Sequence, residues 1–215
     1  MDIKQFKKLP ILGILRGIKA DSLVPLIEAI FESGLKTIEL TMNTDGACGL
    51  IKKAVKLSKG KLNIGAGTVL DMDSLKQALD AGATFIVSPV LVKDVVRYCA
   101  KNKIPVFPGA LTPQEIFDAW REGADMVKVF PIKFFGPQYL KEIKGPFAEI
   151  ELLACAGITP GNLAEYFSCG ASAVAFGANV FSRGRLERGD YSGIAASIKA
   201  YLESFNRYSA LKRRP

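Results

Sequence analysis

Histidine is absent from the 215 residues of this chain. Its absence excludes a histidine metal site and every catalytic dyad or triad that is built on an imidazole. General acid–base chemistry must therefore be carried by carboxyl, amino, phenol or thiol groups, or by water.

Cysteine and long apolar runs are also scarce. The four cysteines, Cys48, Cys99, Cys155 and Cys169, are widely separated and form no CxxC pair. This spacing predicts free thiols in a cytoplasmic protein, not a disulfide framework or a zinc site. No run of about 18 apolar residues occurs, and residues 1–8 lack the apolar core of a secretion signal. We therefore expect neither a membrane span nor export.

Acidic residues are fewer than basic ones, which gives a formal net charge of +8. Arg207, Lys212, Arg213 and Arg214 lie in the last nine residues, and we interpret this segment as a solvated basic tail from about residue 207. The basic residues do not gather beside aromatics in a nucleic-acid motif, so we expect no nucleic-acid partner. A net positive charge on the folded domain would help to attract an anionic metabolite.

Short apolar segments alternate with helical patterns along the whole chain. The eight predicted strands recur every 20–26 residues, at 11–16, 36–41, 62–66, 84–87, 105–107, 124–130, 150–154 and 172–176. Helical patterns lie between them, a short helix is expected at 2–8, and the last helix is expected at 190–205. This order predicts a single α/β domain over residues 1–215, a closed (β/α)8 TIM barrel with a short N-terminal helix. An open doubly wound sheet is the alternative.

Capping residues predict where several helices begin and end. Asp21 or Ser22 is expected to cap a helix that stops at Gly34. The pair Thr112-Pro113 is typical of a helix start, with threonine as the cap and proline in the first turn. The segment 157–160 is expected to start another capped helix.

One lysine interrupts the apolar stretch 124–131. Strand alternation places Met126, Lys128 and Phe130 on one face. Burial disfavours a charged amine, so Lys128 is either paired with a carboxylate or partly neutral, and a neutral amine attacks carbonyl carbons. Glu39 is the expected partner, because its apolar neighbours at 38 and 40 should point outward. The pair could be purely structural, but active sites of these barrels lie at the carboxyl ends of the strands, which favours catalysis.

Other residues at the carboxyl ends of the strands are candidates for ligand binding. The loop with Gly67 and Thr68 lets a backbone approach a ligand and offers a hydroxyl group. Gly157 and Gly177 with Ala178 follow strands seven and eight, where phosphate binds in many such barrels. Arg16 is either an anion ligand or a rim charge.

Taken together, the chain from Leu9 to about Tyr201 resembles the KDPG/KHG aldolase family, the 2-keto-3-deoxy-6-phosphogluconate and 4-hydroxy-2-oxoglutarate aldolases. The motifs that carry the resemblance are Ile38–Thr44, Gly65–Val69, Ser88-Pro89, Phe107–Gly109 with Thr112, Pro113 and Glu115, Val127–Pro131, and Gly157-Ile158 with Asn162. The resemblance implies a class I aldolase without metal or cofactor, usually a homotrimer. It implies Lys128 as the Schiff-base lysine, Glu39 as the proton-transferring group, Thr68 as a pyruvate contact and Phe130 as the aromatic contact.

The implied reaction cleaves a 2-keto-3-deoxy sugar acid, with or without a 6-phosphate, to pyruvate and an aldehyde such as glyceraldehyde 3-phosphate. Three loops of the chain depart from the sequence pattern of the KDPG enzymes. Ala154-Cys155-Ala156-Gly157 replaces Pro-Thr-Gly-Gly, Asn179 replaces a serine, and Asn43 replaces an arginine. Asn43 looks more like the branch that acts on the galactonate-derived epimer.

These observations leave several substrates and roles open. The alternatives are an aldolase for 4-hydroxy-2-oxoglutarate or for the galactonate epimer, another phosphate-binding barrel enzyme, and a non-catalytic keto-acid-binding barrel. The predicted catalytic residues are Lys128 and Glu39, and the predicted substrate-binding residues are Arg16, Asn43, Gly67, Thr68, Pro89, Phe130, Cys155, Gly157, Gly177, Ala178 and Asn179.

Overall fold

The computed structural model describes residues 1–212, and its strands form one all-parallel sheet. The strands are β1 (Ile11–Leu15), β2 (Thr37–Thr41), β3 (Asn63–Gly67), β4 (Ile86–Val87), β5 (Val106–Phe107), β6 (Gly109–Ala110), β7 (Val127–Val129), β8 (Leu152–Cys155) and β9 (Ala173–Phe176). Their order is β5-β4-β3-β2-β1-β9-β8-β7-β6.

The two ends of this order, β5 and β6, belong to a single barrel strand that is interrupted at Pro108. Proline has no N–H group to donate, so the ladder breaks there. The Pro108 carbonyl still accepts the Lys128 N–H at 2.9 Å, and the Val106 carbonyl accepts the Asp125 N–H at 3.2 Å. The segment therefore joins β4 to β7 and closes the ring. The predicted (β/α)8 barrel is confirmed, and the open sheet is wrong.

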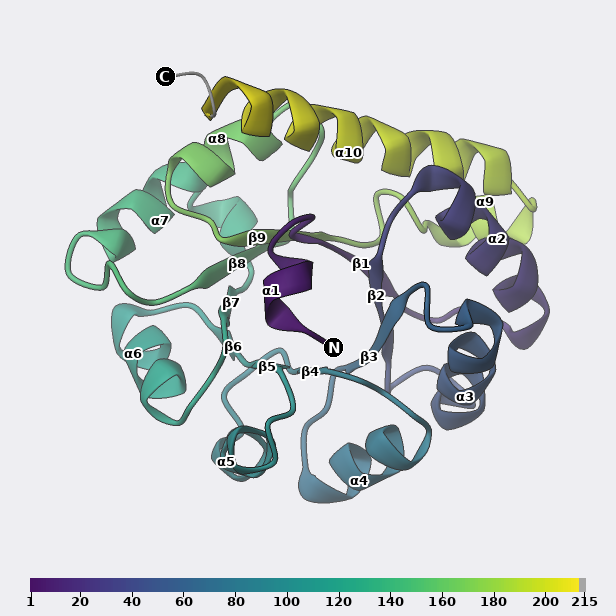
Figure 1. The fold of residues 1–215 in the computed structure, drawn as a ribbon, viewed down its shortest axis with the longest axis horizontal. Coiled ribbons are helices and arrows are strands. Elements are labelled where there is room, and N and C mark those ends of the chain that lie inside the picture. The colour runs from purple at the N-terminus through teal and green to yellow at the C-terminus, as the bar shows by residue number, and fades with distance from the viewer. Residues whose placement is uncertain (213–215) are drawn as a thin grey trace.

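The helices lie around the outside of the ring of strands, except α1, which lies over its centre (Figure 1). They are α1 (Ile3–Phe6), α2 (Leu23–Ser33), α3 (Ala47–Ser58), α4 (Met72–Asp80), α5 (Lys93–Lys101), α6 (Pro113–Arg121), α7 (Pro137–Lys144), α8 (Leu163–Ser168), α9 (Arg183–Glu187) and α10 (Tyr191–Lys212), with two 3-10 turns, η1 (Ala20–Ser22) and η2 (Ile132–Phe134). None of the helices in this described part of the chain has the length and apolarity that crossing a bilayer requires.

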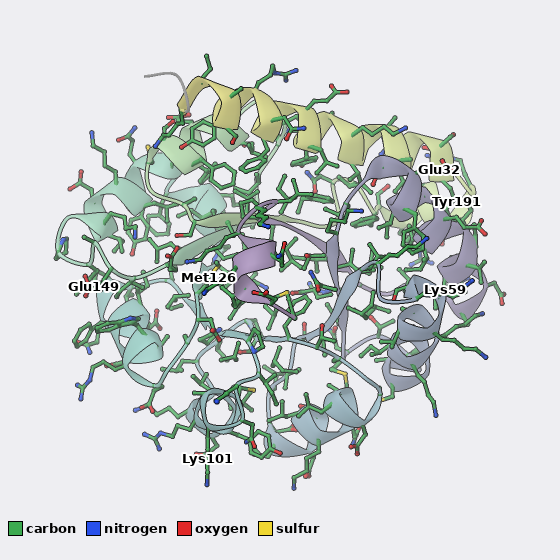
Figure 2. The ribbon with its side chains drawn as sticks, viewed as in Figure 1. Glu32, Lys59, Lys101, Met126, Glu149 and Tyr191 are labelled. Atoms are coloured by element: carbon green, nitrogen blue, oxygen red, sulfur yellow. The ribbon has the colours of Figure 1, made fainter. Side chains whose placement is uncertain are left out.

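Strand alternation divides the apolar side chains into two cores. Ile38, Leu40, Val127 and Val129 pack outward against the helices. A smaller inner core fills the barrel and includes Met126. Figure 2 shows Met126 near the barrel axis, whereas the labelled charged residues lie at the outer edge of the molecule. The predicted division of the faces is confirmed.

Helix α1 lies across the mouth at the amino ends of the strands (Figure 1). The ring of Phe6 stacks on Phe107 at 5.9 Å, and Phe107 lies 5.9 Å from Phe85, between ring centroids. The Met1 amino group donates to the Thr84 carbonyl at 3.0 Å. The short N-terminal helix is thus a plug that extends the inner core to this end of the barrel.

Helix starts follow the capping signals only in part. Thr112 caps α6 in a capping box with Glu115, as predicted. Gly34, at φ +88°, ends α2 as predicted. Ser22 occupies the N-cap position of α2, as one of the two predicted candidates, but it makes no side-chain cap bond because residues 20–22 form η1.

The helix predicted to start within 157–160 begins later, at Leu163. Thr159 and Asn162 bond each other reciprocally: the Thr159 N–H donates to Asn162 Oδ1 at 2.8 Å, and the Asn162 N–H donates to Thr159 Oγ1 at 3.3 Å. These bonds form a turn that precedes the six-residue α8.

The predicted basic tail is wrong at its start, because α10 continues to Lys212. Apolar contacts explain the extra length: the ring of Tyr208 stacks on Phe167 at 5.4 Å, beside Phe205. Arg207 and Lys212 are therefore helical. Arg213 and Arg214 lie outside the described residues. Helix α9, which precedes α10, was not predicted.

Candidate active site

Lys128 and Glu39 meet inside the barrel. Lys128 is the central residue of β7 and Glu39 the central residue of β2, two strands that are not neighbours in the sheet. Lys128 Nζ lies 4.0 Å from Glu39 Oε1, and their side chains are 7% and 1% exposed. The alternation of both strands brings the pair together, as the sequence predicts.

The Glu39 carboxylate fits because β3 carries a glycine beside it. A Cβ added to Gly67 would lie 2.8 Å from Glu39 Cδ and still closer to Oε1. Such a distance is far inside van der Waals contact, so a side chain at position 67 would displace the carboxylate. Gly67 thus makes room for Glu39, a role that sequence reasoning did not assign.

Burial controls the protonation of this carboxyl group. It raises the pKa of Glu39, and the nearby positive charges of Lys128 and Arg16 only partly oppose this effect. Glu39 Oε2 is buried and has no hydrogen-bond partner among the described residues. A buried oxygen without a partner is costly, so its presence marks a place where a ligand group or water can bind. The pair can exchange protons and can offer an amine to a carbonyl.

Two further side chains border the amine. Lys128 Nζ lies 5.5 Å from the ring centroid of Phe130, which is half-buried and packs against the inner core. Cys155, at the end of β8, is buried, and burial raises the pKa of its thiol. The thiol is therefore neutral. Phe130 is therefore both a side chain of the inner core and an apolar wall beside Lys128.

Thr68 follows β3 with a φ of +56°. The left-handed region is uncommon for residues other than glycine and is enriched at functional sites. The preceding carbonyl, that of Gly67, accepts the Met42 N–H at 2.7 Å, which ties this loop to the loop after β2.

The loop after β8 contains two successive residues with positive φ, Ala156 and Gly157, both at +81°. Asn162 Nδ2 donates to the Gly157 carbonyl at 3.0 Å and holds the loop. A Cβ added to Gly157 would lie 2.6 Å from Lys133 Cβ, so the glycine packs closely on the Lys133 stem. Sequence reasoning missed Lys133, because only the tertiary structure brings η2 against this loop.

The loop after β9 is held by its asparagine. Asn179 Nδ2 donates to the Ile158 carbonyl at 3.0 Å and also contacts the Tyr201 hydroxyl group. Its amide nitrogen thus bonds within the protein. Gly177 lies against Ile14, and Ala178 is exposed.

The remaining candidates lie on neighbouring loops at the same end. Arg16 and Asn43 are exposed, on the loops after β1 and β2. Pro89 is half-buried after β4, and Gly109 allows the two backbones to approach, since a Cβ there would overlap the Pro89 carbonyl. Sequence reasoning also missed Thr44, which is buried and accepts a hydrogen bond from the Gly17 N–H.

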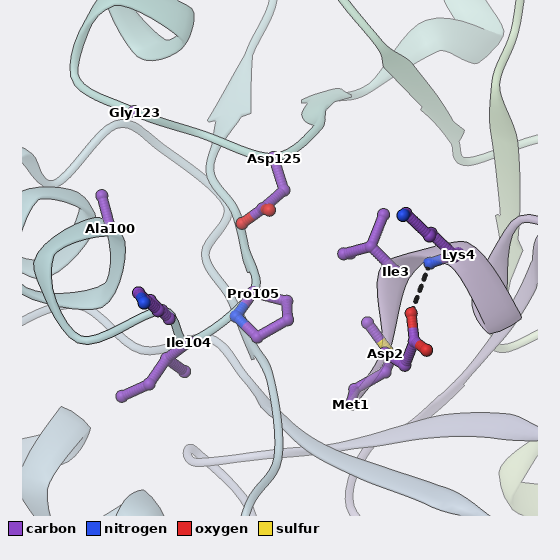
Figure 3. A pocket seen from close by; sticks show the side chains of 10 residues that line it. Met1, Asp2, Ile3, Lys4, Ala100, Ile104, Pro105, Gly123 and Asp125 are labelled. Carbon is purple, nitrogen blue, oxygen red and sulfur yellow. Dashed lines mark hydrogen bonds between the residues drawn. The ribbon is translucent and has the colours of Figure 1, made fainter.

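A separate hollow lies at the opposite end of the barrel. Figure 3 shows it beside α1, with Asp2, Ile3, Pro105 and Asp125 among its lining residues. Pro105 and Asp125 directly precede β5 and β7, so this hollow opens at the amino ends of the strands. It contains neither Lys128 nor Glu39.

Comparisons with known proteins agree with this geometry. The family model "KDPG and KHG aldolase" matches residues 3–197. The chain is 33% identical over 198 residues to the 2-dehydro-3-deoxy-6-phosphogalactonate aldolase of Escherichia coli (strain K12), covering 92% of this chain and 97% of the relative.

Two solved structures are also similar. One, described as "Native KDPGal structure", has a TM-score of 0.88 and 30% identity, covering 94% of this chain and 97% of the other. The other, the KDPG aldolase of Legionella pneumophila with pyruvate captured as a covalent carbinolamine intermediate, has a TM-score of 0.83 and 25% identity, covering 89% and 93%. The chain therefore belongs to the KDPG and KHG aldolase family of carbon–carbon lyases.

Proposed function

We propose that this chain is a class I aldolase that cleaves a 2-keto-3-deoxy-6-phospho sugar acid to pyruvate and an aldehyde such as glyceraldehyde 3-phosphate. The observation that carries the proposal is the buried pair of Lys128 and Glu39, 4.0 Å apart, with one glutamate oxygen left free. It places a nucleophile and a proton carrier together where active sites of these barrels lie.

The reaction begins when Lys128 Nζ gives up a proton and attacks the C2 ketone of the substrate. Glu39 supplies the proton with which the carbinolamine hydroxyl leaves as water, and a protonated imine remains. The Glu39 carboxylate then takes the proton of the C4 hydroxyl group. The C3–C4 bond breaks, its electron pair moves to the imine nitrogen, and the aldehyde departs from an enamine of pyruvate.

The enamine next takes a proton at C3. Water adds at C2, and the amine leaves to release pyruvate and regenerate Lys128. The raised pKa of Glu39 suits this cycle, because a carboxyl group that shuttles protons works best when its pKa lies near the working pH.

The two ends of the substrate have different proposed contacts. At the keto-acid end these are Arg16, Asn43, Thr68, Pro89, Phe130 and Cys155. At the distal end they are Gly157, Gly177, Ala178 and Asn179. We add Lys133 to the distal set, because its stem packs on Gly157 and an ammonium there is suited to a phosphate.

A second candidate substrate is the galactonate-derived epimer. Asn43 stands where the KDPG type has an arginine, and a relative that is 33% identical is a phosphogalactonate aldolase. The two epimers differ in configuration at C4, the carbon whose hydroxyl group Glu39 deprotonates, so the choice concerns how that hydroxyl group is held and leaves imine formation on Lys128 unchanged.

Trapping of the imine tests the chemistry. The protein is incubated with pyruvate and borohydride, and the modified peptide is mapped by mass spectrometry. We expect one reduced adduct, on Lys128. The absence of an adduct on Lys128 would sink the aldolase proposal.

A substrate panel tests the specificity. It contains the gluconate- and galactonate-derived keto-deoxy acids, each with and without the 6-phosphate, and 4-hydroxy-2-oxoglutarate. We expect the phosphorylated acids to react fastest, and Lys133→Ala to raise their KM about tenfold while leaving the unphosphorylated acids unchanged. An adduct on Lys128 without aldehyde release from any of these acids would instead indicate a keto-acid-binding barrel.

We further infer a cytoplasmic homotrimer. Its support is the resemblance to this family, the four free cysteines, and large apolar side chains exposed on the loops after β3, β4 and β7. These are Leu70 at 50%, Val90 at 52%, Phe134 at 72% and Phe135 at 53% exposure. Light scattering coupled to size exclusion should give three times the chain mass, and a monomer would contradict the inference.

A further inference from the structure

We propose that Thr44 is a positioning residue that holds the Arg16 loop against the strand that carries Glu39. The proposal rests on the proposed function, since it concerns the charge that Arg16 places near the proton-transferring carboxyl group. No motif in the sequence assigns a role to Thr44.

The Thr44 hydroxyl group connects two loops and a strand. It accepts a hydrogen bond from the Gly17 N–H at 2.9 Å, and it shares a second bond with the Thr41 hydroxyl group at 3.0 Å. Thr44 is 6% exposed and Thr41 is fully buried. Thr41 lies on β2, two residues after Glu39, and therefore on the same inward face.

The bond to Gly17 acts on Arg16 through the backbone. The N–H of Gly17 belongs to the peptide group that joins Arg16 to Gly17, so this bond restrains the rotation of that group about the Arg16 backbone. Arg16 and Gly17 are exposed between Leu15 and Ile18, which are buried. Gly17 also has a φ of +63°. Thr44 thus anchors, by its hydroxyl group, the exposed turn that carries the Arg16 side chain.

Three titratable or charged groups face Glu39 from the elements around it. Lys128 on β7 lies 4.0 Å from Glu39, the charge of Arg16 on the loop after β1 partly opposes the rise in the pKa of Glu39, and the neutral Cys155 thiol lies at the end of β8. The neighbouring β3 presents glycines, Gly65 and Gly67. Arg16 is the one of the three that lies on an exposed loop, so its distance from Glu39 depends on what holds that loop.

The decisive experiment measures the titration of Glu39 directly, by NMR of protein labelled with carbon-13 at the glutamate carboxyl groups. Thr44→Val and Thr44→Ala remove the hydroxyl group, and Thr44→Ser keeps it. We expect Thr44→Val and Thr44→Ala to raise the pKa of Glu39 by about half a unit, which is the loss expected for a partly solvated charge. Thr44→Ser should titrate like the parent protein.

Arg16→Gln removes the charge itself and should raise the pKa of Glu39 by the same amount. The double variant Arg16→Gln with Thr44→Val should raise that pKa no further. In the enzyme assay the acid limb of kcat/KM should move upward by the same amount. Ile198→Ala, at a buried position in α10, lowers stability and removes neither hydrogen bond of Thr44, so it should leave the Glu39 titration unchanged.

A Thr44→Val or Thr44→Ala variant that titrates like the parent would overturn the proposal, as would an Arg16→Gln variant without a shift. Additive shifts in the double variant would also overturn it. If the parent protein released no pyruvate from any acid of the panel while Glu39 shifted as expected, the positioning role would stand and the proposed function would fail.

Discussion

The two ends of the barrel differ in how their polar groups are paired. At the amino ends of the strands, the Asp125 carboxylate accepts the Val106 N–H at 3.0 Å, Lys7 Nζ lies 2.6 Å from Glu151 Oε1, and α1 covers the mouth. At the carboxyl ends, Glu39 Oε2 has no partner among the described residues, and the buried Lys128 Nζ lies 4.0 Å from Glu39 Oε1.

The amino ends of the strands therefore contribute mainly to the stability of the fold, whereas the carboxyl ends contain the candidate active site. Paired groups and an apolar plug lower the free energy of the folded state. An unpaired buried oxygen raises it, so it persists where a ligand requires it. The hollow beside α1 (Figure 3) is therefore a poorer candidate for catalysis than the Lys128 end.

The largest expected effect is that of Lys128→Ala. Removal of the nucleophile should lower kcat by about 10⁴-fold or more, because no imine can form. Pyruvate release, followed by a coupled assay, measures the loss. The matched control is Lys7→Ala at the other end, which breaks an exposed ion pair and should leave kcat within about twofold and stability within ~1 kcal/mol. Full activity in Lys128→Ala would refute the proposed role.

Glu39→Gln should lower kcat by about 10²–10⁴-fold, since the amide cannot transfer protons. Borohydride trapping with pyruvate on this variant should also be slow, because dehydration of the carbinolamine needs a proton. Trapping and turnover at the parental rate would show that another group moves these protons.

The same variant tests the pH dependence of stability. Burial raises the pKa of Glu39 in the folded state, so the folded protein binds this proton more tightly than the unfolded chain does. The contribution of Glu39 to stability is therefore greatest at acidic pH and decreases as pH rises through its folded pKa. We expect the melting temperature of the parent, relative to that of Glu39→Gln, to be higher at pH 5 than at pH 8. The opposite trend would contradict the raised pKa.

Phe6→Ala tests the plug. Loss of the ring that stacks on Phe107 should destabilise the protein by about 3–5 kcal/mol, measured by urea denaturation. The kcat of the folded fraction should stay within about twofold, because Phe6 lies at the end away from Lys128. A tenfold loss of kcat with the fold intact would show that the two ends are coupled.

The smallest expected effect is that of Ala156→Gly. Glycine adopts a φ of +81° without the steric cost that alanine has, so the variant should be more stable by about 1 kcal/mol. Ala154→Gly, two residues earlier and inside β8, is the control and should be less stable by about 1 kcal/mol. Equal effects of the two changes would contradict the strain assigned to Ala156.

Much of the fold was predictable because local signals agree with the tertiary structure. The period of two in each strand separates inner from outer residues, and Gly34 and Thr112 act where the sequence places them. The strand that resumes after Pro108 was not predictable, because Gly109 and Ala110 pair with β7 only once the ring has closed. The length of α10 was missed because Tyr208 finds its partner, Phe167, only after folding.

The candidate site divides in the same way. Lys128 and Glu39 could be identified because each is a charge within an apolar strand. Lys133, Thr44 and the space that Gly67 leaves for Glu39 carry no such local signal. Asn179, which stays a proposed substrate contact, also bonds to the Ile158 carbonyl and to Tyr201 of α10, a partner 22 residues away in the chain that the sequence did not predict.

The sequence by itself determined which residues face the inside of the barrel, because side-chain direction follows from the local backbone period. It also excluded histidine from the chemistry and led to the proposal that a lysine and a glutamate carry it. Only the tertiary structure decided the 4.0 Å separation between Lys128 Nζ and Glu39 Oε1. It also decided that Glu39 Oε2 has no hydrogen-bond partner among the described residues. These depend on the closure of the ring, which places strands far apart in the sequence across one small interior.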